Sequence, residues 1–221
     1  MPEGPEIRRA ADELAEVLAR RVALRVEFGL PALRKHGPRL SGVRIEAVES
    51  RGKALLLHFA GGVSVYTHNQ LYGRWRIVQA GRRPQTTRQL RLAIDTRGAS
   101  ALLYSASDIL VCQRVELDRH PYLSGLGVEL LDPRTTFAQV TGQCESAKFQ
   151  RRGLAALLLD QGFLAGIGNY LRSDILFAAR LHPSSRPCDL APTQLATLAR
   201  VALHMTRQSY RTRGITNDPT L

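Results

Sequence analysis

The sequence predicts an α+β fold in which an N-terminal helix and an antiparallel β-sandwich precede a helical domain. Three observations predict it. Apolar residues repeat at helical spacing over residues 3–21, alternate with a period of two over about residues 22–112, and return to helical spacing beyond that point. His120-Pro121 and Asp132-Pro133 break the backbone pattern between the last two regions. We therefore expect two domains, a β-sandwich domain over residues 1–120 and a helical domain over residues 121–221.

The first helix begins near Pro5, a residue suited to a first helical turn, and ends at Arg20-Arg21, whose charges favour the negative end of a helix. Seven short strands follow, separated by turn signals that are rich in glycine. Their predicted ranges are 22–28, 43–48, 54–59, 63–67, 75–78, 90–95 and 101–104. The helices predicted for the second domain span residues 135–141, 153–160, 169–179 and 193–210, with a tight turn at 165–168.

The charge of the chain favours a polyanionic partner. Its 221 residues carry 31 Lys and Arg against 19 Asp and Glu, a net charge of +12, and 44% of them are hydrophobic, as expected of a folded chain. Cations laid along phosphates release condensed counterions, so nucleic acid is the leading candidate partner. The alternative is an arginine-rich composition with no such partner.

Targeting and metal signals are weak. The first 20 residues mix acids and bases, and no apolar run approaches the roughly 18 residues of a membrane span, so we expect a cytoplasmic protein with no membrane partner. The cysteines Cys112, Cys144 and Cys188 are odd in number and far apart, which predicts reduced thiols and no Cys-x-x-Cys metal site.

The N-terminal residues Met1 to Glu6 could carry chemistry. Removal of Met1 would leave Pro2 with a free secondary amine, and an α-amino group has a pKa of about 7.7–8.0, so part of it is nucleophilic at neutral pH. Attack on a sugar C1′ would give an iminium, with Glu3 placed to protonate the ring oxygen and Glu6, one turn on, placed to position groups. Alternatively, Pro2 and Pro5 only shape the entry to the helix.

Lys53 follows Gly52 at the entry to an apolar strand, and it is one of only three lysines in the chain. Its ammonium could hold a phosphate or move a proton. The alternative is a solvated lysine at the end of a strand.

A turn at His68-Asn69-Gln70-Leu71-Tyr72-Gly73 combines amides with apolar side chains, a mixture suited to opening a duplex. In the alternative, Leu71 and Tyr72 pack back on the sheet. Residues 158–170 predict two helices joined at Gly166-Ile167-Gly168, where backbone N–H groups, the Asn169 amide and the nearby Arg172 could meet phosphate. A plain corner between two helices is the alternative.

Together, from residue 2 to about residue 214, these segments resemble the formamidopyrimidine-DNA glycosylase and endonuclease VIII family. The resemblance rests on Pro-Glu-Gly-Pro-Glu at residues 2–6, Arg51-Gly52-Lys53, and Gly-Ile-Gly-Asn at residues 166–169. It implies a helix-two-turns-helix module in the second domain. Residues 6–12, 68–73, 84–88 and 103–108 are similar to the bacterial endonuclease VIII branch, which implies oxidised pyrimidines as substrates.

By this resemblance, Pro2 is the Schiff-base nucleophile, Glu3 a proton donor, and Lys53 a proton donor in β-elimination. The residues implied to fill the gap left by a flipped nucleotide are Gln70, Leu71 and Tyr72, and Asn169 is implied to bind phosphate. The resemblance further implies a monomeric bacterial enzyme that acts on double-stranded DNA and associates with the nucleoid during repair.

Family members usually carry a C-terminal zinc finger with two Cys-x-x-Cys pairs, and this sequence has neither pair. We therefore expect no zinc or other cofactor in this chain. The function expected is that of a base-excision DNA glycosylase and abasic-site lyase. Two alternatives are a non-catalytic DNA-binding fragment or paralogue of the same family, and a structural nucleic-acid protein that shares only the helical module.

Overall fold

The computed structural model describes residues 2–216, which form two compact units. The first unit holds Pro2 and Ile7–His120, and the second holds Glu3–Glu6 and the chain from Pro121 onward. The N-terminal segment therefore belongs partly to each unit. No helix among the described residues has the length and apolar character needed to cross a membrane.

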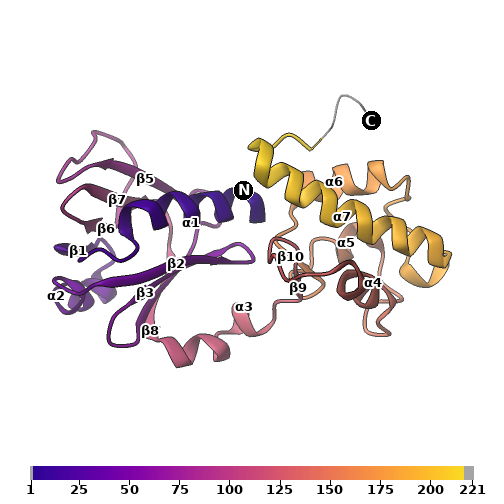
Figure 1. Ribbon diagram of the computed structural model, residues 1–221, viewed down its shortest axis with the longest axis horizontal. Helices are drawn as coiled ribbons and strands as arrows, with labels where there is room; N and C mark the ends of the chain where they lie inside the picture. The colour runs from indigo at the N-terminus through magenta and orange to yellow at the C-terminus, as the bar shows by residue number, and fades with distance from the viewer. Residues whose placement is uncertain (1, 217–221) are drawn as a thin grey trace. The chain divides into compact units, whose positions relative to one another are not determined.

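The first unit contains the predicted helix and two four-stranded antiparallel sheets (Figure 1). Helix α1 (Gly4–Leu18) is shorter than expected because Arg20 adopts a left-handed conformation, with φ of 63°, that ends the helical path. One sheet has the order β1-β6-β7-β5 and the other the order β2-β3-β4-β8. The strands are β1 (Arg25–Phe28), β2 (Ile45–Arg51), β3 (Ala54–Phe59), β4 (Val63–His68), β5 (Arg74–Gln79), β6 (Leu90–Asp95), β7 (Ala99–Tyr104) and β8 (Asp108–Gln113).

The core of the first unit joins one face of α1 to both sheets. The helix buries the side chains that share its apolar face, Ile7, Ala11, Leu14 and Leu18. The central strands β3 and β7 are buried along their whole length. The seven predicted strands are all present, but the eighth strand, β8, was not predicted. It is an edge strand with only Ile109 buried, and its apolar run does not alternate.

The second unit is mainly helical. Its main helices are α4 (Phe137–Glu145), α5 (Leu154–Leu157), α6 (Asn169–Ala178) and α7 (Pro192–Thr212). Helix α4 begins two residues later than predicted because Thr136 is its N-cap and forms a capping box with Gln139. The helix predicted for residues 153–160 is a single turn. The Asp160 Oδ1 atom accepts a hydrogen bond from the Gly162 N–H at 2.8 Å, and this local turn replaces further helix.

Shorter elements complete the two units. A parallel pair of two-residue strands, β9 (Val128–Glu129) and β10 (Leu164–Ala165), was not predicted because two residues show no periodicity. The remaining helical turns are η1 (Pro31–His36), α2 (Gly37–Leu40), η2 (Arg114–Arg119), α3 (Pro121–Ser124) and η3 (Pro187–Asp189). The fold class predicted from the sequence, with an N-terminal helix, antiparallel sheets and a helical second part, is confirmed.

Candidate active site and nucleic-acid interface

The Glu3 carboxylate is bound by the first turn of α6 in the second unit. Its Oε2 atom accepts hydrogen bonds from the N–H groups of Gly168 at 2.7 Å and Leu171 at 3.4 Å, and Oε1 accepts one from Tyr170 N–H at 2.9 Å. These are the donors that an α-helix leaves unsatisfied at its N-terminus. Glu3 is only 3% exposed, so the helix dipole and the N–H groups stabilise its negative charge out of contact with bulk water.

This contact changes the role expected of the α6 N-terminus. The sequence indicated that its backbone N–H groups could meet DNA phosphate, but those of Gly168, Tyr170 and Leu171 donate to Glu3 instead. The side chain of Asn169 is exposed, and Arg172 is half-buried one turn further along α6. Phosphate binding at this end of α6 would therefore use these two side chains.

The glycines of the preceding turn make room for the N-terminal segment. The Gly4 N–H donates to the Gly166 carbonyl at 2.8 Å, and a Cβ added to Gly4 would lie 2.9 Å from the Gly166 Cα. A Cβ added to Gly168 would collide with the Glu3 carboxyl group. The Gly166-Ile167-Gly168 turn therefore fits a peptide segment rather than a phosphate.

A partly buried chain of hydrogen bonds supports the same segment. Glu6 Oε2 accepts a hydrogen bond from the Glu3 N–H at 2.9 Å, and Glu6 Oε1 accepts one from the Tyr170 hydroxyl at 3.1 Å. The Tyr170 hydroxyl also lies 2.8 Å from Ser209 Oγ of α7. Burial raises the pKa of Tyr170; the Ser209 hydrogen bond opposes this shift, and the charges of Glu6 and Glu3 add to it.

Tyr170 and Ser209 were not predicted as site residues. Tyr170 directly follows the motif at residues 166–169, so its place in the chain was the available signal. Ser209 lies in a long amphipathic helix, where nothing in the local pattern distinguishes it.

Lys53 occupies a two-residue turn between β2 and β3 in the first unit. Gly52 enters this turn with φ of 57°, a conformation that glycine adopts without steric cost. Lys53 is only 9% exposed, so the alternative of a solvated lysine is wrong. In the sheet register, the next residue, Ala54, pairs with His68, which pairs with Asp108. Burial and the Lys53 charge lower the pKa of His68, against the raising effect of Asp108.

The loop between β4 and β5 projects its apolar side chains into solvent. Leu71 is 54% exposed and Tyr72 is 67% exposed, so they do not pack back on the sheet. Gln70 has φ of 50°, and its Oε1 atom accepts a hydrogen bond from Ser107 Oγ at 2.9 Å. The loop is closed by the Gly73 N–H, which donates to the Asn69 carbonyl at 2.7 Å.

The predicted site residues thus form two groups. Glu3, Glu6, Asn169 and Arg172 belong to the second unit, and Pro2 belongs to the first unit with Lys53 and residues 70–72. Pro2 is half-buried, two residues before the start of α1. Within residues 2–216, no cluster of three or more His, Cys, Asp or Glu side chains is arranged to hold a metal ion.

Comparison with known proteins identifies the family. Residues 1–106 match the formamidopyrimidine-DNA glycosylase N-terminal domain, and residues 126–218 match the H2TH domain of the same family. The chain is 46% identical over 218 residues to Endonuclease 8 of Klebsiella pneumoniae, covering 99% of this chain and 83% of that protein. It is 47% identical over 214 residues to Endonuclease 8 of an Escherichia coli strain, covering 97% and 81%.

Solved structures show the same fold. The wild-type Lactococcus lactis Fpg (MutM) in complex with DNA containing N7-benzyl-Fapy-dG gives a TM-score of 0.83 at 15% identity, covering 99% of this chain and 82% of that one. A complex of the same enzyme with DNA containing an oxidised pyrimidine gives a TM-score of 0.83 at 16% identity, covering 97% of this chain and 82% of that one. The resemblance inferred from the motifs is therefore confirmed, and the chain belongs to the formamidopyrimidine-DNA glycosylase family, on the side of the bacterial Endonuclease 8 proteins.

Proposed function

We propose that this protein is a bifunctional DNA glycosylase and abasic-site lyase that removes oxidised pyrimidines from double-stranded DNA through the amine of Pro2. The observation that carries the proposal is the fixed N-terminal segment: the carboxylate directly after Pro2 is held by three backbone N–H groups. A nucleophile must be held in a defined geometry to react efficiently, and this anchoring supports such a role for Pro2. The similarity to Endonuclease 8 proteins supports the substrate class.

The reaction follows from amine chemistry. Once Met1 has been removed, the Pro2 nitrogen attacks C1′ of the damaged nucleotide, and the C1′–N bond to the base breaks as the base takes up a proton. Glu3 accepts the proton that the Pro2 nitrogen releases and passes it to O4′, so the C1′–O4′ bond breaks, the sugar opens and an iminium remains at C1′. Loss of a C2′ proton then expels the 3′ phosphate by β-elimination, and hydrolysis of the iminium releases the enzyme.

Lys53 and Glu6 have supporting roles in this proposal. Lys53 is a buried ammonium near the end of β2, suited to binding a phosphate or supplying a proton during elimination. Glu6 accepts hydrogen bonds from the Glu3 N–H and from Tyr170, so it holds the backbone that carries the reactive groups.

The exposed loop supplies the groups that would replace the flipped nucleotide. Leu71 and Tyr72 are large, apolar and exposed, and Gln70 adds an amide beside them. Such side chains can fill the space between base pairs, while Asn169 and Arg172 contact phosphate. The net charge of +12 supports binding to DNA by counterion release.

We further propose that the chain acts as a monomer and uses no cofactor in this chemistry. The reacting groups are an amine, a carboxyl group and an ammonium group, all supplied by the chain itself.

Borohydride trapping tests the proposal. The protein, incubated with a duplex containing thymine glycol or an abasic site and reduced with borohydride, should form a covalent DNA adduct that Pro2→Gly does not form. N-terminal mass spectrometry should show that Met1 is absent. Binding of the duplex without any trapped adduct would instead support the non-catalytic alternative.

A further inference from the structure

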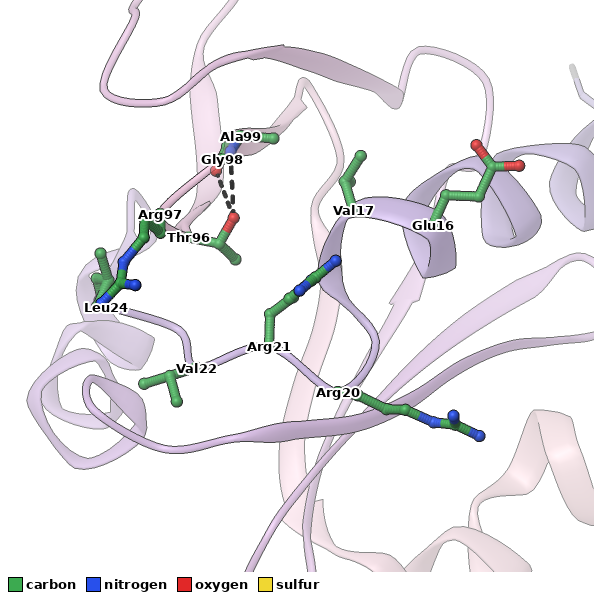
Figure 2. Close-up of a pocket in the computed structure, with 10 residues that line it drawn as sticks. All are labelled: Glu16, Val17, Arg20, Arg21, Val22, Leu24, Thr96, Arg97, Gly98 and Ala99. Carbon is green, nitrogen blue, oxygen red and sulfur yellow. Dashed lines mark hydrogen bonds between the residues drawn. The ribbon is translucent and has the colours of Figure 1, made fainter.

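An open pocket of about 620 Å³ lies at the C-terminal end of α1, within the first unit (Figure 2). Its walls come from the end of the helix, the segment that leads into β1, and the turn between β6 and β7. The lining residues are Glu16, Val17, Arg20, Arg21, Val22, Leu24 and residues 96–99. The β6–β7 turn is fixed by the Thr96 N–H and hydroxyl, which both donate to the Ala99 carbonyl, at 2.8 and 3.0 Å.

Two apolar side chains of this pocket are held in solvent. Val22 is 44% exposed and Leu24 is 56% exposed. Their backbone is fixed, because Val22 bridges to Arg44 and the Leu24 N–H donates to the Asp95 carbonyl at 2.7 Å. The side chains therefore cannot fold inward without breaking these contacts, and a ligand with an apolar group would remove them from water.

Unpaired positive charge surrounds this apolar surface. Neither Arg21 nor Arg97 forms an ion pair or a side-chain hydrogen bond with any residue between 2 and 216. Arg97 and Leu24 both line the pocket. Figure 2 shows the Arg21 side chain directed toward the α1 end, whereas Arg20 extends away from the other lining residues. Glu16 is the only acidic lining residue, so the rim is positive overall.

The pocket is distant from Lys53. Residues 20 and 21 form backbone hydrogen bonds with Ile45, the first residue of β2, at 2.7 and 2.8 Å. Lys53 lies beyond Arg51, the last residue of the same seven-residue strand. At about 3.3 Å per residue, β2 separates the two places by roughly 20 Å. The pocket is therefore separate from the lysine proposed to act on DNA.

We propose that this pocket binds a short acidic peptide segment of a partner protein. One apolar side chain of the peptide packs against Val22 and Leu24, and flanking carboxylates pair with Arg21 and Arg97. Charge complementarity selects an acidic ligand, and the apolar surface selects a peptide over a nucleic acid, because a sugar-phosphate backbone has no aliphatic side chain to place there. This proposal is independent of the glycosylase chemistry.

Fluorescence anisotropy of the full chain with a fluorescein-labelled Gly-Asp-Asp-Leu-Asp-Leu-Asp peptide tests the proposal. We expect saturable binding that weakens at least about fivefold when both leucines of the peptide are replaced by serine. The double variant Arg21→Ala/Arg97→Ala and the single variant Leu24→Ser should each weaken binding at least about fivefold. The matched control Arg34→Ala/Arg39→Ala removes two exposed cations outside the pocket. It should change the peptide affinity less than twofold, because salt screens the attraction of distant surface charges.

Two results would overturn the proposal. Equal affinity for the leucine and serine peptides, or equal weakening by the control pair, would show general charge attraction only. A single-stranded oligonucleotide could also displace the peptide. If binding of this oligonucleotide depends on Arg21 and Arg97 but not on Leu24, the pocket is a nucleic-acid surface instead. Borohydride trapping by the double variant should equal that of wild type in either case, so failure here is distinguishable from failure of the glycosylase proposal.

Discussion

Replacing Gly168 by alanine should dislodge the Glu3 carboxylate without replacing any residue that is proposed to react. The added Cβ would lie closer to the Glu3 carboxyl carbon and Oε1 than the 3.0 Å that Cβ atoms keep from other heavy atoms. The methyl group is fixed to the backbone, so the carboxylate must move away from α6. Its hydrogen bonds to the N–H groups of Gly168, Tyr170 and Leu171, at 2.7, 2.9 and 3.4 Å, would then be lost or lengthened.

The size of the effect on stability follows from two terms. Inserting a methyl group into a packed site costs about 1–3 kcal/mol, and a hydrogen bond to a charged group contributes about 1.5–3 kcal/mol. Because water can replace part of the lost bonding, we expect destabilisation of about 2–4 kcal/mol. This lowers the melting temperature by roughly 5–15 °C for a chain of this size.

The effect on activity should be larger than the effect on folding. A positioned general acid contributes about 10²–10⁴-fold to a rate, and Gly168→Ala should remove most of that contribution. The assay is single-turnover cleavage of a thymine glycol duplex, measured at a temperature where circular dichroism shows the variant to be folded.

Gly142→Ala is the matched control. Gly142 lies within α4 of the same unit, and a Cβ added there meets no atom within 4 Å. We expect this control to keep wild-type activity and to gain about 0.4–1 kcal/mol of stability. A Gly168→Ala variant that cleaves and traps DNA at the wild-type rate would refute the reasoning that the Glu3 position matters.

Four further predictions concern other features of the structure. Tyr170→Phe removes the hydroxyl that donates to Glu6 and should lower the single-turnover rate by about tenfold, since it loosens the N-terminal segment; activity equal to wild type would exclude a positioning role. Burial raises the pKa of Tyr170 above the value of about 10 that it has in an unfolded chain, so the unfolded state loses this proton first as pH rises. The free energy of unfolding should therefore fall as pH rises above about 10, and it should fall less steeply in Tyr170→Phe. The double variant Leu71→Ala/Tyr72→Ala should keep the melting temperature within about 2 °C of wild type, since both side chains are exposed. In a gel-shift titration it should bind an abasic duplex about tenfold or more weakly. Unchanged affinity would contradict the proposal that these side chains fill the space left by the flipped nucleotide. Burial raises the pKa of Cys144 to about 12, so Cys144 should react with a thiol reagent only after unfolding. Cys188 is exposed and should react at pH 8 within minutes, and peptide mass mapping would distinguish the two.

The sequence predicted the elements of the fold because their patterns are local. The spacing of Ile7, Ala11, Leu14 and Leu18 defines one helical face, and that face is buried. Strand β8 was not predicted because its run from Ile109 to Cys112 is uniformly apolar, and because its edge position leaves every residue except Ile109 half-buried or exposed. Hydrophobic periodicity arises where one face of a helix or strand is buried against the core. Segments with little buried surface therefore show only a weak pattern.

The candidate site could be predicted only in part. The motif residues Glu3 and Lys53 were identified as candidates from their chemistry, and the structure shows that both are buried. The partners of Glu3 could not be predicted, because its hydrogen bonds join residues 165 to 168 positions apart. No local pattern encodes a contact of that separation, so the turn at Gly166-Ile167-Gly168 was interpreted as a phosphate site when it holds the N-terminal segment.

The anchoring of Glu3 also sets an order of events during synthesis. The residues that bind it are made about 165 positions after it, which takes about 10–30 s at ordinary rates of translation. Through that interval the residues that bind Glu3 do not yet exist, so the N-terminal segment stays accessible to processing enzymes. Under the proposed mechanism, removal of Met1 in this interval would free the Pro2 amine before the residues that bind Glu3 are in place.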